Sequence, residues 1–311
     1  MGLRRREDAP RGVVVGPDRG IVEPIRLERL FPPADLAHVV EHVWIVHWDV
    51  RATGPRTTVT LPHPAVHWVV EGESNEVVGV HPGRFVRRLE GKGRVVGVRF
   101  RTGAFTAFTD VSMATLAGRR FSAAQFLPGA EGLAERLAGE SDDEAARLVL
   151  DVVRAHARPL SPRAKRVHRI VERITSDREL VSVEGVGVAF GMRPLALQRL
   201  FRETLGVSPK WVIQRARVHE AVERIADDAR RGVKTSHAAL ALELGFTDQA
   251  HFTRTFGTFV GSSPRAYARA LQEAKSTREA KSKREAKSES KSQKKSEAKK
   301  SEEAKRKRKP R

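Results

Sequence analysis

The 311-residue sequence contains no cysteine and no long apolar run. The first absence excludes disulfide bridges, thiolate metal sites and cysteine nucleophiles, and it fits a reducing compartment. The second leaves no segment near the roughly 20 apolar residues that span a bilayer. The opening MGLRRREDAPRG has arginines without a following apolar stretch, so no secretory signal is expected. We therefore expect a cytoplasmic protein without a membrane partner.

Common catalytic motifs are also missing. Neither the G-x-S-x-G nucleophile motif nor the G-x-x-x-x-G-K-[ST] phosphate loop occurs. Residues 38–42, HVVEH, fit the H-x-x-E-H pattern of inverted zinc peptidases, but no distal acidic ligand is identifiable and the valines favour burial or a strand. An enzyme that used these histidines would require bound zinc. We expect no enzymatic activity, no metal and no cofactor.

Positive charge is the strongest feature of the composition. The formal net charge is +20, and residues 274–311 contribute +11 of it from 17 basic and 6 acidic side chains, which leaves +9 for residues 1–273. A folded part with this positive charge is suited to bind a polyanion such as a nucleic acid, because each neutralised phosphate releases condensed counterions. Charge that serves only solubility is the alternative explanation.

The sequence divides into regions of different composition. Residues 1–20 are rich in Arg, Gly and Pro and are predicted to be a disordered arm. Residues 21–157 alternate short β-type runs (56–61, 66–70, 95–100) with turn signals and end in a helical stretch at 144–157. The prolines of 158–162 (RPLSP) predict a linker.

Residues 163–271 show helical periodicity throughout, and residues 272–311 form a low-complexity basic tail. In that tail Glu-Ala-Lys recurs at spacings that are multiples of six, which builds no apolar stripe on a helix. The predicted fold is multidomain α+β: a β-rich N-terminal domain, an all-α domain and a disordered Lys-rich tail.

An internal repeat lies within the helical region. Residues 195–212 match residues 250–267 at an offset of 55, and the matched pairs are Leu197/Phe252, Arg199/Arg254, Phe201/Phe256, Gly206/Gly261, Ser208/Ser263 and Pro209/Pro264. In each copy a short helix (183–190 or roughly 236–244) ends at a glycine and a second helix follows. A long helix at 209–229 joins the copies. This order is that of a helix-turn-helix.

The second helix of the second copy has two distinct faces. Phe252 and Phe256 are four residues apart and face inward, whereas Gln249, Thr253 and Arg254 lie toward the other side, with His251 near the boundary. Such an arrangement is typical of a helix that reads base edges in a major groove. A packing module with a solvated polar face is the alternative.

Two stretches carry a resemblance to a known family. GFTDQAHFTRTFGTFVGSSPRAY (245–267) resembles the C-terminal signature of the AraC/XylS family of bacterial transcription regulators, and GMRPLALQRLFRETLGVSP (191–209) resembles its first helix-turn-helix. The resemblance covers about residues 163–270. It implies seven helices, with two recognition helices about 34 Å apart that enter successive major grooves of double-stranded DNA.

The resemblance also implies which side chains meet DNA. The residues expected to contact bases are Arg193, Leu195, Gln198 and Arg199 in the first copy and Gln249, Ala250, His251 and Arg254 in the second. Arg199 and Arg254 are expected to pair with guanine, Gln198 and Gln249 with adenine, and Leu195 or Ala250 with a thymine methyl group. Candidate phosphate contacts are Lys210, Arg215 and Arg217.

The first copy departs from the family pattern. Gly185 and Gly187 lie inside its first helix, where each glycine costs about 0.5–1 kcal/mol relative to alanine. Arg193 stands where a capping serine is usual. We therefore expect the first subdomain to be the less stable one.

Residues 21–157 resemble the cupin-like β-rich domains that precede the DNA-binding part of some AraC-type regulators. The resemblance implies effector sensing, dimerisation or both, and allows a small-molecule effector, RNA polymerase and a second copy of the chain as partners. Candidate pocket residues are Trp44, Trp48, His67, Trp68 and Arg99; the alternative is that the tryptophans fill a β-core. The sequence thus predicts a sequence-specific, nucleoid-associated transcription regulator, with a tail-driven architectural DNA-binding protein as the alternative.

Overall fold

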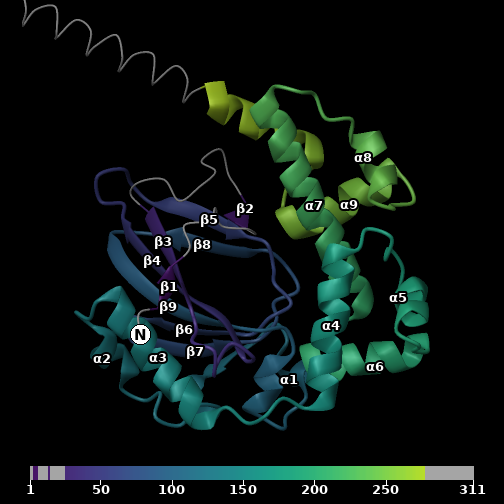
Figure 1. Ribbon diagram of the computed structural model, residues 1–311. Helices are drawn as coiled ribbons and strands as arrows, with labels where there is room; N and C mark the ends of the chain where they lie inside the picture. The colour runs from purple at the N-terminus through teal and green to yellow at the C-terminus, as the bar shows by residue number, and fades with distance from the viewer. Residues whose placement is uncertain (1–2, 6–12, 15–24, 277–311) are drawn as a thin grey trace, which may run out of the picture.

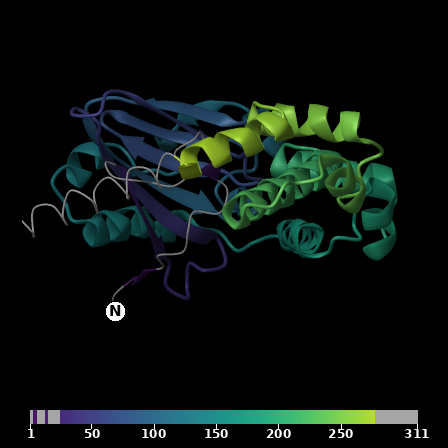
Figure 2. The same cartoon turned by 90° about the horizontal axis from the view of Figure 1, so that it is seen from above.

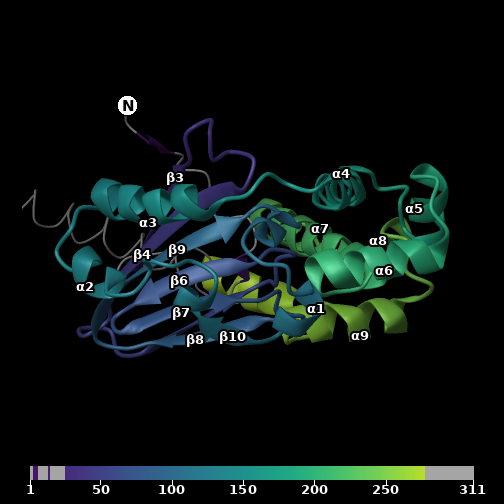
Figure 3. The ribbon, with the colours of Figure 1, turned by 90° about the horizontal axis from the view of Figure 1, so that it is seen from below.

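The computed structural model describes residues 3–5, 13–14 and 25–276. Figure 1 shows a β-rich body that contains the N-terminal part of the chain, with a bundle of helices beside it. Figures 2 and 3 show the same side-by-side arrangement from above and below. The molecule thus has the α+β architecture predicted from the sequence.

We call the β-rich N-terminal part of the described chain the β-body. It consists of two antiparallel sheets. The larger has seven strands in the order β1-β3-β4-β9-β6-β7-β10, and the smaller has three in the order β2-β5-β8. The strands are β1 Arg4–Arg5, β2 Val13–Val14, β3 Ile25–Phe31, β4 Val40–Asp49, β5 Arg56–Thr60, β6 His67–Glu71, β7 Ser74–Val78, β8 Phe85–Leu89, β9 Lys92–Phe100 and β10 Arg120–Ser122.

Side chains alternate between the two faces of the large sheet. In β6, Trp68 and Val70 are buried in the main hydrophobic core, whereas His67 points to the opposite face. On that opposite face the Trp44 ring lies over Gly97, where a Cβ atom would come within 2.1 Å of it. Glycine is therefore required beside the tryptophan, and one face of the sheet is left free to line a cavity.

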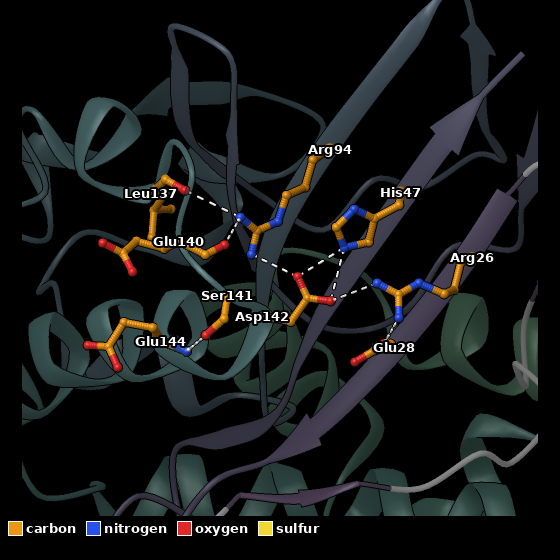
Figure 4. A network of polar contacts seen from close by, with 9 residues as sticks. All are labelled: Arg26, Glu28, His47, Arg94, Leu137, Glu140, Ser141, Asp142 and Glu144. Atoms are coloured by element: carbon orange, nitrogen blue, oxygen red, sulfur yellow. Dashed lines mark hydrogen bonds and ion pairs between the residues drawn. The ribbon is translucent and has the colours of Figure 1, made fainter.

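Helices cover the face of the large sheet that carries Trp68. They are α1 Met113–Leu116, α2 Leu133–Leu137 and α3 Asp142–His156, with 3-10 turns at Ala104–Ala107 and Ala123–Gln125. The first residue of α3, Asp142, accepts bonds from Arg26 (3.1 Å), His47 (2.9 Å) and Arg94 (2.8 Å) of three strands, as Figure 4 shows. This buried carboxylate fixes the start of α3 on the sheet.

Seven helices make up the C-terminal part of the described chain, the number that the resemblance implied. They are α4 Pro162–Ser176, α5 Val183–Ala189, α6 Pro194–Leu205, α7 Pro209–Arg231, α8 His237–Glu243, α9 Gln249–Val260 and a last helix at 264–276.

The two parts of the molecule share a hydrophobic core. One cluster joins Phe100 and Phe105 of the β-body to Val167 of α4 and Phe201 of α6. Gly206 ends α6 at φ 80°, and a Cβ atom there would lie 2.4 Å from the Met113 carbonyl oxygen of α1. A second cluster contains α8, α9 and much of α7, with Leu61 from the β-body. The first helix-turn-helix is thus the more closely joined to the β-body.

Several local expectations need correction. Arg4–Arg5 pairs with β3 and Val13–Val14 with β5, so the prediction of a disordered arm at 1–20 is wrong at these four residues. Residues 40–42 of the HVVEH sequence lie in β4, which begins at Val40, so the strand that the valines favoured is present. The disordered tail was predicted mostly for residues that lie outside the described ranges. No described helix is both long and apolar enough to cross a membrane.

Candidate nucleic-acid interface and ligand cavity

The two helix-turn-helix copies have closely matching geometry. Helices α5 and α8 each have 7 residues, α6 and α9 each have 12, and the start of α9 follows that of α6 by 55 residues. The turn glycines Gly191 and Gly245 adopt φ 60° and 69°. After them the amides of Met192 and Phe246 bond to the carbonyls of Gly187 (2.8 Å) and Ala241 (2.9 Å). The same turn is therefore built twice.

Packing orients both second helices as predicted. Leu197 and Phe201 of α6 and Phe252 and Phe256 of α9 are fully buried. The side chains proposed to contact bases lie on the exposed face, apart from the half-buried His251: Arg193, Leu195, Gln198, Arg199, Gln249, Ala250 and Arg254. Leu195 is 77% exposed, which no packing requirement explains.

The two copies differ in how their second helices begin. The Asp248 carboxylate caps α9 by accepting a 2.7 Å bond from the His251 amide, and this hydrogen bond lowers the pKa of Asp248. Arg193 occupies the equivalent position before α6 and makes no capping bond with its side chain. His251 itself packs its ring against Phe246 and lies 3.3 Å from the Thr247 hydroxyl, so it also supports the turn.

The two equivalent arginines also have different neighbours. Arg199 Nε donates to Glu203 at 2.8 Å, and Glu203 also pairs with Arg163. The residue equivalent to Glu203 in the second copy is Thr258, and Arg254 makes no ion pair within residues 25–276. The guanidinium of Arg254 therefore has fewer charged partners in the described chain than that of Arg199.

Two of the three expected phosphate contacts have other roles. Arg215 is buried: its Nε donates to the Pro62 carbonyl at 2.9 Å and one terminal nitrogen lies 3.0 Å from His63 Nδ1, both in the β-body. Burial lowers the pKa of Arg215 to about 10. The prediction that Arg215 faces phosphate is wrong in this arrangement, because its donors connect α7 to the β-body.

Arg217 is likewise engaged inside the helical region. It donates to the Val181 carbonyl and its guanidinium lies 5.5 Å from the centre of the Phe246 ring. It thereby joins the segment before α5 to the turn of the second copy, which corrects the phosphate prediction. Lys210, in the first turn of α7, is exposed.

The β-body encloses a cavity of about 260 Å³ between its two sheets. Three of the five predicted pocket residues line it, Trp44, His67 and Arg99, and the Trp44 indole donates to His67 Nδ1 at 3.3 Å. The prediction is wrong for Trp68, which is fully buried in the core and donates to Asn75 at 2.6 Å. It is also wrong for Trp48, which packs in a separate small cluster.

The polar end of this cavity carries an unusual set of basic groups. Arg99 lies 3.1 Å from Glu41, yet its Nε lacks a hydrogen bond of proper geometry, so the contact is an ion pair only. Burial lowers the pKa of the Arg99 guanidinium. It also lowers the pKa of His67 to about 3 and the pKa of His42 to about 2. The histidines are therefore neutral. The sequence did not predict His42 and His63 as pocket residues, because the pairing of β4 with β9 brings His42 beside Arg99 and the packing of α7 on the β-body brings Arg215 to His63.

Within the described ranges, no group of three His, Asp or Glu side chains could hold a metal ion. His38 and His42 of the HVVEH sequence lie at the entrance to β4, the first exposed and the second buried.

Comparison with known families agrees with this geometry. Residues 187–270 match the family described as a helix-turn-helix domain, and residues 28–122 match a domain of unknown function (DUF6597). With two helix-turn-helix units joined by a long helix, the molecule is a DNA-binding transcription regulator that carries an additional N-terminal domain. Residues 187–270 thus belong to a helix-turn-helix family, as the resemblance to AraC/XylS regulators implied.

Solved structures that match part of the chain include two bacterial regulators. A probable AraC family regulator from Rhodopseudomonas palustris is 25% identical, covering 35% of this chain and 97% of that one, with a TM-score of 0.30. The C-terminal domain of AraT, a response regulator from Geobacillus stearothermophilus, is 23% identical. The match covers 36% of this chain and 88% of that one, with a TM-score of 0.30.

A third structure covers more of the chain. ToxT from Vibrio cholerae, with an unsaturated fatty acid bound, is 9% identical. The match covers 86% of this chain and 99% of that one, with a TM-score of 0.34. No curated protein sequence matches the chain. The assignment of the DNA-binding part depends on the match of residues 187–270 and on the repeated motif.

Proposed function

We propose that the protein binds specific DNA sequences by placing α6 and α9 in successive major grooves of one duplex. The observation that carries this proposal is the pair of equivalent helices, each with a buried apolar face and an exposed face of arginine and glutamine. Helix α7 has 23 residues and spans about 35 Å, close to one turn of DNA.

Specific roles follow from the chemistry of each exposed side chain. Arg199 and Arg254 read guanine through paired bonds to O6 and N7, and Gln198 and Gln249 read adenine. Leu195 and Ala250 touch thymine methyl groups. Arg193 and His251 contact neighbouring bases, and Lys210 contacts a phosphate.

The N-terminal domain is proposed to sense a small molecule in the cavity between its sheets. The cavity combines apolar walls with the half-buried Arg99. In the described chain, Glu41 is the one carboxylate that forms an ion pair with it. An apolar molecule with one acidic group fits this combination, since an anion would compensate the desolvated guanidinium. Arg215 reaches this end of the β-body from α7, so the effector state can be transmitted to the DNA-binding helices.

The protein acts in this proposal without catalysis, in the cytoplasm on the nucleoid, with RNA polymerase and a second copy of the chain as further partners. A second function, tail-driven architectural DNA binding, is favoured by one observation: residues 274–311 carry +11. In that case affinity would depend on the tail and show little sequence preference.

Selection of random DNA duplexes by the whole protein tests the proposal. We expect two conserved blocks of bases whose centres lie about one helical turn apart. Enrichment of a single block would mean that only one copy reads bases. The absence of any enriched sequence would contradict the proposal and favour the architectural function.

A further inference from the structure

A second cavity, of about 550 Å³, lies where the β-body meets α4, and we call it the interdomain cleft. Ala37, His38, Arg101 and Thr102 form its wall on the β-body, and Leu160 belongs to the connection between the parts. Lys165, His168 and Arg169 form its wall on α4. None of these residues has a place in the proposed reading of bases or in the cavity between the sheets.

The arginine and lysine side chains that line the cleft have no acidic partners among the described residues, and the Arg101 side chain donates only to the Ala37 carbonyl. Arg101, Lys165 and Arg169 make no ion pair with any described residue, and no carboxylate lines the cleft. Elsewhere on α4, Arg163 pairs with Glu203 and Arg173 with Asp177, while Arg166 donates to the Phe190 carbonyl.

Two of these three unpaired charges lie close together on one face of α4. Lys165 and Arg169 are four residues apart, a spacing at which like charges destabilise a helix by a few tenths of a kcal/mol. Between them His168 pairs with Glu172 through Nε2 at 3.1 Å, while its Nδ1 is buried without a hydrogen-bond partner among the described residues. An anion in the cleft would relieve the repulsion.

We propose that the interdomain cleft binds a small organic molecule through its phosphate group. Three permanent cations suit a group that carries about −1.5 to −2 charges at neutral pH, as a phosphate monoester does. Arginine and lysine are the side chains that proteins commonly use for phosphate. Leu160 and Ala37 supply apolar surface for the organic part of the molecule.

The size of the cleft favours a small molecule over DNA. Its volume of about 550 Å³ corresponds to a cube with an edge of about 8 Å, within the 300–1,000 Å³ range of small-molecule sites. The major groove of duplex DNA is by itself about 12 Å wide, so a duplex does not enter such a space.

Because the walls come from both parts of the chain, the ligand stabilises their docked arrangement. A ligand shifts a conformational equilibrium by its difference in affinity for the two states. The complete site exists only when α4 lies against the β-body, so a bound phosphate ester favours that state. Binding of the phosphate ester does not depend on the proposed DNA-binding function. Any effect of the bound ester on DNA affinity does rest on that proposed function.

The test uses the full chain without DNA and phenyl phosphate as the probe. Titration calorimetry and thermal unfolding at constant ionic strength would compare it with phenol and chloride. We expect phenyl phosphate alone to bind and to raise Tm. In the variant Lys165→Gln/Arg169→Gln we expect the affinity to fall at least tenfold. Both side chains are exposed, so the fold is retained.

Two matched variants control for charge and for folding. Lys92→Gln/Arg136→Gln removes one lysine and one arginine from exposed positions outside the cleft and should bind as the unchanged protein does. Lys165→Arg/Arg169→Lys keeps both charges and should retain binding. Equal affinity in the cleft variant and the first control, or no binding of phenyl phosphate to the unchanged protein, would overturn the proposal. These outcomes leave the DNA selection result unaffected.

Discussion

Arg199 and Arg254 occupy equivalent positions on the two recognition helices, but only Arg199 is held by an ion pair, with Glu203. Binding of guanine by Arg199 must therefore compete with Glu203. We predict that Arg254→Ala lowers affinity for the selected site by about 1–3 kcal/mol and blurs one block of bases. Arg199→Ala should have a smaller effect. Binding titrations measure both, and a larger loss for Arg199→Ala would contradict this comparison.

Arg215 and Lys210 lie five residues apart on α7 but are predicted to act differently. Arg215→Met leaves the Pro62 carbonyl without its donor, so the free energy of unfolding should fall by about 1–3 kcal/mol while the salt dependence of DNA affinity stays unchanged. Lys210→Met should leave stability unchanged and reduce the slope of log K against log salt by about 1. If Arg215→Met reduced that slope, the buried role of Arg215 would be wrong.

The neutral histidines of the cavity predict a pH dependence of stability. Burial lowers the pKa of His67 to about 3, whereas in the unfolded chain it is about 6.5. The unfolded state therefore binds more protons below pH 6.5, and stability falls as the pH drops, by up to about 1.4 kcal/mol per pH unit for each such histidine. Denaturant unfolding from pH 7.5 to 5 should show a shallower loss for His67→Gln than for the unchanged protein.

Among the structural elements, α5 has two glycines whose surroundings differ. A Cβ atom at Gly187 would lie 2.7 Å from the backbone oxygen of Met192, which the turn holds in place, whereas at Gly185 it would lie 3.2 Å from the Ser182 hydroxyl. Gly187→Ala should thus lower the free energy of unfolding by about 1–3 kcal/mol despite the better helix propensity of alanine. Gly185→Ala should be close to neutral. Chemical denaturation of both variants tests this, and equal effects would contradict it.

The three helices of the DNA-binding part whose bounds were predicted, α5, α7 and α8, have ends within two residues of those bounds because their signals are local. Gly191 and Gly245 end short helices, and Pro194 and Pro209 begin longer ones. The cost assigned to Gly187 from helix propensity alone was incomplete, because the close approach of Met192 is a tertiary contact.

The arrangement of the β-body depended on long-range pairing that the sequence does not display. His67 and Arg99 are 32 residues apart and become partners in the register of β6 and β9. Trp68 and Trp44 resemble each other in the sequence, yet the alternation of strand faces sends one into the core and the other to the cavity. Arg215 could not be distinguished from a surface cation without the docked β-body.

At the scale of the whole molecule, we predict that the basic tail and the folded part make separate contributions to DNA binding. Residues 277–311 carry 16 basic and 6 acidic side chains, a net charge of +10. Their deletion should weaken binding to all duplexes about equally, reduce the salt dependence and leave the preferred site unchanged. The deletion begins after Lys275, which donates to the Arg230 carbonyl at the end of α7. Loss of site preference in competition assays would contradict this division.

The shared hydrophobic core makes the first helix-turn-helix part of a larger folded unit. Phe201 of α6 lies in the same cluster as Phe100 of β9, whereas Phe252 and Phe256 of α9 lie in the other. The whole molecule therefore holds the two recognition helices through α7 and through the β-body together, and rigid spacing between the two blocks of bases is expected.

That spacing gives the most direct test of the claim that α6 and α9 read successive grooves of one duplex. The affinity of the full chain for its selected site would be measured as base pairs are inserted between the two blocks. An insertion of five base pairs turns the second block to the opposite side of the duplex, since one turn takes about 10.5. We predict at least a tenfold loss of affinity. Unchanged affinity would contradict the claim.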